Sequence, residues 1–100
     1  MKYSDALKMA HANKHLIGKV WNNAVVDEIL IAPTNSKERS VFEKRYVQTL
    51  DAQESIIPFV NSDVEVVLIC NKDMIRTTGL FTYISIEALP KSLNVIMTIK

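Results

Sequence analysis

The stretch from Val64 to Cys70 constrains the fold of this chain more than any other. Its residues, Val-Glu-Val-Val-Leu-Ile-Cys, lie between the turn formers Asn-Ser-Asp at 61–63 and Asn-Lys-Asp at 71–73. A short run of β-favouring residues with turn chemistry at both ends predicts a strand. Both of its faces are largely apolar, whereas a strand with one face in water alternates more strictly. The sequence therefore predicts a central strand that is covered by other layers on both sides.

Length and charge restrict the kind of protein that this can be. One hundred residues is the common size of one domain, and we expect a single α+β domain over residues 1–100. The 12 Lys and Arg residues nearly balance the 11 Asp and Glu residues, which gives a formal net charge of +1. Such a chain has no overall electrostatic attraction to nucleic acid or to an anionic membrane. Any charged partner must therefore bind to a local patch.

Cysteine use and hydropathy indicate a location. The single cysteine, Cys70, cannot form a disulfide within the chain, and a reducing, cytoplasmic location fits this best. No window approaches the roughly 20 apolar residues of a membrane span, and no apolar signal segment follows the N-terminus. We expect a cytoplasmic protein that does not bind membranes.

The remaining elements follow from periodicity and turn chemistry. Helices are predicted from Ser4, as a cap, to His15 or Leu16, and from about Lys37 to Ala52 with Asn35 or Ser40 as the cap. Besides 64–70, strands are predicted at Leu16 to Trp21, Val25 to Ala32, Ile56 to Val60, Leu80 to Glu87 and Leu93 to Ile99. Asn22 and Asn23 suit a tight hairpin, and the charged pair Asp27 and Glu28 indicates a bulge or an edge. The segment Lys72 to Gly79 is predicted to be a loop.

This order, α-β-β-α-β-β-β-β, predicts a mostly antiparallel sheet of about five or six strands with two helices packed on one face. The second face is not fully polar, since Val67 and Ile69 lie on it. Hydrophobic residues make up 48% of the chain, which is a surplus for a small protein. A second copy of the chain is the simplest cover for that face. We therefore expect a homodimer or a higher oligomer.

Motifs for catalysis, metals and cofactors are missing, so we predict no catalytic residue, no cofactor and no metal site, and lean toward a non-enzyme. Only two glycines occur, too few for a glycine-rich phosphate loop. His11 and His15 are four apart on a predicted helix, but no other ligand has a spacing that completes a zinc site. Cys70 lies in an apolar strand, where a thiolate is disfavoured.

Three functional hypotheses remain. The leading one is a self-associating protein-interaction module that binds another protein through Met74, Ile75 and Arg76, because apolar residues in a loop commonly mark a contact surface. The alternative for Met74 and Ile75 is that they fold back over the core as a lid. The second is a nucleic-acid accessory protein with a basic first helix, using Lys8, His11, Lys14 and Lys19. The third is a small-ligand binder or enzyme with its site at a subunit interface, where polar groups such as His11, Arg76 and Glu87 would converge.

Overall fold

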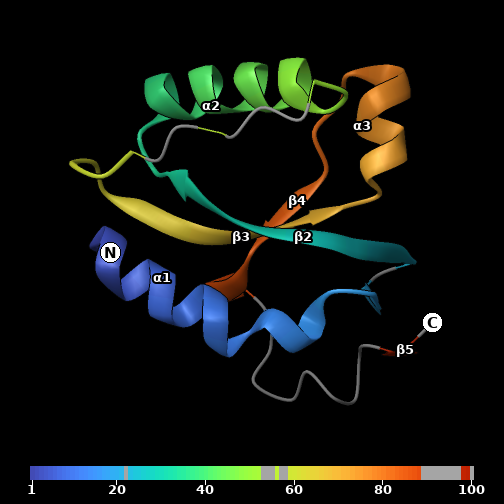
Figure 1. Cartoon of the computed structure of the whole chain (residues 1–100), viewed down its shortest axis with the longest axis horizontal. Helices are drawn as coiled ribbons and strands as arrows, with labels where there is room; N and C mark the ends of the chain where they lie inside the picture. Colours follow the sequence, from blue (N-terminus) through green and yellow to red (C-terminus); the bar gives the residue numbers. More distant parts are fainter. Residues whose placement is uncertain (22, 53–55, 57–58, 89–97, 100) are drawn as a thin grey trace.

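The chain is an α+β domain with an antiparallel sheet, as the sequence predicts (Figure 1). The computed structural model describes residues 1–21, 23–52, 56, 59–88 and 98–99. Its helices are α1 (Tyr3–Ala12), α2 (Ser36–Thr49) and α3 (Lys72–Thr78), with short 3-10 turns η1 (Lys14–Leu16) and η2 (Ile86–Ala88). Its strands are β1 (Lys19–Trp21), β2 (Ala24–Pro33), β3 (Val64–Cys70), β4 (Tyr83–Ser85) and β5 (Thr98–Ile99). The strand order is β4-β3-β2-β1-β5.

The strand predicted at 64–70 is β3, and it lies in the interior of the sheet. It pairs with β2 from Val64, opposite Pro33, to Cys70, opposite Val26, and its other edge pairs with β4. Every side chain from Val66 to Cys70 is fully buried. The prediction that both faces of this strand are covered is confirmed.

Both covers come from the same chain, and here the sequence-based architecture is wrong. Helix α1 lies on one face of the sheet, whereas α2 and α3 lie on the other (Figure 1). Ala6 of α1 packs against Val64 and Val66, and Phe42 of α2 packs in the cluster that contains Val67 and Ile69. An amphipathic pattern identifies the buried side of a helix but not the sheet face that it covers. The argument that a second copy must cover the sheet therefore loses its basis.

A third helix replaces the loop predicted at Lys72 to Gly79. Asn71 adopts a left-handed conformation, with φ 51°, and turns the chain out of β3. Gly79, with φ 71°, ends the helix in the left-handed cap that glycine favours. Ile75 is fully buried in the cluster that contains Tyr46 and Ile69, so packing stabilises this helix of seven residues. Short helices depend on such tertiary contacts, which local sequence does not reveal.

Several predicted boundaries are confirmed. The Val25 to Ala32 strand is β2, and its register shifts between Val26 and Glu28, where the bulge was expected. Asn23, with φ 63°, supplies the positive backbone angle of the hairpin. Asn35 caps α2, since its Oδ1 accepts hydrogen bonds from the amides of Lys37 (2.9 Å) and Glu38 (3.3 Å).

Other predicted elements are shorter or absent. Ser4 does not cap α1, because the helix begins at Tyr3. The first strand is reduced to β1, since Leu16 is buried within η1 instead of extending the strand. Residues 80–87 contribute only β4, because η2 begins at Ile86. Of the strand predicted at 56–60, the described residues 56, 59 and 60 belong to no strand. Of the strand predicted at 93–99, residues 93–97 lie outside the described part, and β5 pairs with β1.

Candidate functional site

The outer edge of β2 carries backbone groups that point away from the sheet. The amide of Val64 donates to the carbonyl of Met1 (3.1 Å), and that of Cys70 donates to Thr82 (2.9 Å), both on the side of β3 opposite to β2. Backbone direction alternates along a strand, so residues 65, 67 and 69 face β2, where their partners are residues 32, 30 and 28. The N–H and C=O groups of Ile29 and Ile31 therefore point to the other edge of β2.

No described strand pairs with that stretch of the edge. Strand β1 pairs with β2 only at Ala24 and Val25, and the last described contact is the amide of Gly18 donating to Val26 (2.8 Å). Beyond this point β2 continues to Pro33 without a neighbour on this side among the residues that the structure describes. Unpaired strand edges are templates for the addition of another strand.

Two adjoining hollows follow this edge, and both are lined by Ala10 and Ile29. The first, of about 250 Å³, also includes Tyr3 and Leu7 on the α1 side of the sheet and Leu30, Phe42 and Ile56 on the α2 side. The second, of about 190 Å³, adds His11, Lys14 and Ile17. We call the two hollows together the edge groove. Leu7 and Ile17 are 39% and 44% exposed, so the groove presents apolar side chains to solvent.

Among the described residues, the lining of the edge groove includes basic side chains and no carboxylate. His11 and Lys14 are exposed and lie together in the second hollow. The two carboxylates of β2 are engaged elsewhere. Asp27 accepts a hydrogen bond of 2.6 Å from the amide of Lys72, and Glu28 pairs with the Lys72 ammonium and accepts from the Tyr46 hydroxyl (3.0 Å). The groove therefore combines apolar walls with local positive charge.

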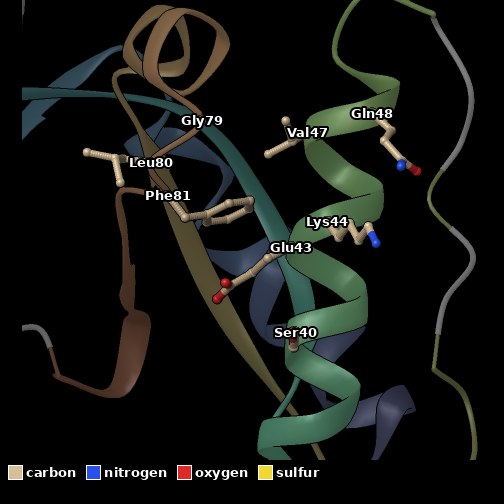
Figure 2. A pocket seen from close by; sticks show the side chains of 8 residues that line it. All are labelled: Ser40, Glu43, Lys44, Val47, Gln48, Gly79, Leu80 and Phe81. Carbon is tan, nitrogen blue, oxygen red and sulfur yellow. The ribbon is translucent and has the colours of Figure 1, made fainter.

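A larger hollow, of about 510 Å³, lies on the opposite face between α2 and the chain that follows α3 (Figure 2). Figure 2 shows Glu43 and Val47 extending from α2 toward Phe81, whereas Lys44 and Gln48 extend to the other side of the helix. Glu43 already accepts a hydrogen bond from the Tyr83 hydroxyl (2.9 Å). Burial raises the pKa of Tyr83, and so does this bond, which keeps the phenol protonated as a donor.

The buried ionisable groups Tyr46 and Cys70 stay protonated at neutral pH, which suits structural roles and not nucleophilic chemistry. Burial, followed by the nearby Glu28 carboxylate, raises the pKa of Tyr46, so its hydroxyl remains a donor. Burial raises the pKa of the Cys70 thiol to about 11, with a further contribution from Asp27. A thiol with such a pKa is hardly ionised at neutral pH and is a poor nucleophile.

Helix α3 places the three predicted protein-contact residues in different environments. Met74 is 54% exposed, but Ile75 is fully buried in the core, so its assignment to a contact surface is wrong. The reason is that the segment is a helix, which turns one side inward. Arg76 is engaged on the surface by Asp51 (2.9 Å) and Asp73 (3.2 Å).

The structure brings the other two predicted groups of site residues together only in part. Of the four basic residues, His11 and Lys14 share a hollow, Lys8 is exposed on α1, and Lys19 lies in β1. Within one chain His11 and Arg76 lie apart, since His11 belongs to α1 on one face and Arg76 to α3 on the opposite face (Figure 1), and Glu87 is exposed in η2. The hypothesis of a site between two subunits stays a prediction. Within the described ranges, no group of three or more His, Cys, Asp and Glu residues is placed to hold a metal ion. None of the helices there has the length and apolar character needed to cross a membrane.

Comparison with protein-family models, with curated proteins and with solved structures found no match to this chain. The geometry of the edge groove therefore carries the functional argument. Sequence reasoning missed Leu7, Ile17 and the open edge. The one available signal was the bulge pair Asp27 and Glu28, which was interpreted as a bulge or an edge.

Proposed function

We propose that this protein is a non-catalytic interaction module that binds an extended segment of a partner protein as an added strand along the outer edge of β2. The observation that carries this proposal is the outward direction of the backbone groups of Ile29 and Ile31 beside an apolar groove. In such complexes main-chain hydrogen bonds supply affinity, and pockets for alternate side chains supply specificity.

The edge groove offers a contact to each face of an added strand. Side chains directly opposite Ile29 and Ile31 would point to the α1 side, where Leu7 is exposed. The side chains between them would point to the α2 side, toward Phe42 and Ile56. Apolar residues at successive positions of the partner would fill both sets of contacts, because successive side chains of a strand point to opposite faces.

A reducing, cytoplasmic location belongs to this proposal. Cys70 is a buried free thiol within β3, and its burial opposes both ionisation and oxidation. A buried free thiol is compatible with a compartment that keeps cysteines reduced.

The test is selection of binders from a displayed library of random ten-residue peptides, followed by affinity measurement on two proline variants. Ile31→Pro removes an outward amide, and proline is tolerated where the N–H faces away from the sheet. Ser85→Pro is the matched control, since the amide of Ser85 also faces outward, from β4, by the same alternation. We expect Ile31→Pro to weaken the selected peptides at least about tenfold, because one main-chain hydrogen bond and the close approach of the strand are lost.

Ser85→Pro should leave the affinity of these peptides unchanged. Retained binding by Ile31→Pro, with circular dichroism showing that the variant is folded, would contradict the proposal. Loss of binding in Ser85→Pro alone would also contradict it and would place the contact at β4.

A second candidate, small-ligand binding, is favoured by the hollow of Figure 2, which combines the apolar Val47 and Phe81 with the Glu43 carboxylate. A fragment screen followed by NMR provides the test. Hits that shift Phe81 and Val47 and are lost in Val47→Trp would support this function. Hits that are insensitive to Val47→Trp would reject it.

A further inference from the structure

We infer that the segment bound along β2 is acidic, with a carboxylate side chain opposite Ile29 that contacts His11 and Lys14 in the edge groove. This inference rests on the proposed function and adds the chemistry of the partner. It follows from the position of His11 and Lys14 in the groove and from the contacts that hold Asp27 and Glu28, the described carboxylates of β2, at Lys72.

The position of the carboxylate follows from the register. Residues directly opposite each other on neighbouring strands place their side chains on the same face of the sheet. The side chain of Ile29 lies on the α1 face, where it lines both hollows. A partner side chain opposite Ile29 would therefore enter the hollow that His11 and Lys14 line. The next partner side chain on that face, opposite Ile31, would meet the exposed Leu7 and is expected to be apolar.

Among the residues that the structure describes, neither His11 nor Lys14 takes part in an ion pair. The carboxylates of Asp27 and Glu28, which are nearest in sequence to Ile29, are held by the backbone amide and the ammonium of Lys72. Asp5 is the single acidic residue of α1 and lies in its first turn, whereas Lys14 follows the opposite end of the helix. A carboxylate from the partner would supply the missing opposite charge, and hydrogen bonds to charged groups are among the stronger ones.

The same charges disfavour a second copy of the chain as the occupant. Two β2 edges paired about a two-fold axis perpendicular to the sheet would place both α1 helices on the same face. Lys8 and Lys14 of one copy would then lie on the same face as those of the other copy, across the new strand pair. Repulsion between like charges opposes that arrangement, whereas an acidic segment has no such repulsion.

The experiment compares three blocked peptides of seven residues by fluorescence anisotropy. They alternate valine and threonine and differ only at the central residue, which is glutamate, glutamine or lysine. The glutamate peptide is expected to bind about fivefold more tightly than the glutamine peptide, the size of one favourable exposed ion pair, and the lysine peptide still more weakly. Lys14→Gln should abolish the preference for glutamate without changing the affinity of the glutamine peptide. Lys19→Gln is the matched control, since Lys19 is basic but lies in β1 outside the groove, and it should keep the preference.

Other outcomes overturn the inference in distinguishable ways. Equal binding of the three peptides, all lost in Ile31→Pro, would reject an acidic partner and leave strand addition standing. No binding by any peptide at millimolar concentration would count against strand addition itself. A dimer in sedimentation equilibrium that Ile31→Pro dissociates would make a second copy the occupant. A labelled single-stranded oligonucleotide could also bind, lose its affinity in Lys14→Gln and resist displacement by the glutamate peptide. That result would identify nucleic acid, and not an acidic peptide, as the partner.

Discussion

The two outer edges of the paired strands β2, β3 and β4 differ in length and in surroundings. Strand β2 is ten residues long and continues past its short partner β1, whereas β4 has three residues and ends where η2 begins. The open part of β2 lies beside an apolar groove with exposed Leu7. At β4, the Arg39 guanidinium lies 4.5 Å from the ring centroid of Tyr83, whose hydroxyl is bonded to Glu43.

Among the residues that the structure describes, the sheet therefore has a long unpaired edge at β2 and a short edge at β4. Short edge strands and nearby charged side chains both discourage pairing with other chains. Strand β4 has both features, so few backbone groups are available there. The open part of β2 is longer than β4, although basic side chains lie beside it, and Pro33 at its end has no amide to donate. We therefore expect an extended partner at β2 and not at β4.

The largest expected effect compares proline at two adjacent positions of β2. Leu30 faces β3 with its amide, so Leu30→Pro removes a hydrogen bond from the interior of the sheet, which we expect to cost about 3 kcal/mol or more. Ile31→Pro removes an outward amide and trims a half-buried side chain, so its cost should be smaller by about 2 kcal/mol. Urea unfolding measures both values. Equal destabilisation by the two prolines would mean that Ile31 does not face an open edge.

A smaller effect is expected at the connection to β4. Ile75 is fully buried in the core, and Ile75→Ala should lower the free energy of unfolding by about 2 to 4 kcal/mol through loss of apolar contacts and cavity formation. Its neighbour Met74 is exposed, and Met74→Ala should change that free energy by no more than about 0.5 kcal/mol. Thermal unfolding followed by circular dichroism distinguishes the two. Similar losses in both variants would show that α3 does not bury Ile75. Both variants, while folded, should bind peptides at β2 as the original chain does.

The smallest effect concerns β3, which both edges share. Burial raises the pKa of the Cys70 thiol from its ordinary value of 9.0 to about 11, so the folded chain holds this proton more tightly than the unfolded chain. The resulting stabilisation is complete below pH 9 and is lost as the pH rises toward 11. Unfolding in urea between pH 8 and 10 should show a decline in stability that is reduced in Cys70→Ala. An identical decline in that variant would assign the effect to other groups, such as Tyr46, whose pKa is also raised.

The sequence was sufficient to predict those elements that local residue patterns determine. The apolar run at 64–70, the hairpin angle at Asn23 and the cap at Asn35 all follow from short-range chemistry, and the structure has each of them. The face that each helix covers could not be predicted in this way, because β3 is apolar on both sides and accepts a helix on either. Helix α3 was missed because its stability comes from Ile75 packing in the core.

The candidate site was predictable only in part. His11 and Lys14 were singled out as basic residues of the first helix, and the structure places both in one hollow. Their position beside the edge of β2 depends on how α1 packs and on where β1 ends. Strand β1 is short because Leu16 is buried in η1, a tertiary effect that the alternation of residues 16–21 does not reveal.

Amide hydrogen exchange along β2 tests the central claim most directly, since outward and inward amides alternate within a single strand. In the free protein the amides of Glu28, Leu30 and Ala32 should exchange slowly, because they donate to β3. The amides of Ile29 and Ile31 should exchange rapidly and become protected when a selected peptide is added. Slow exchange at Ile29 and Ile31 in the free protein, equal to that at Leu30, would show that the edge is already occupied and would contradict the account.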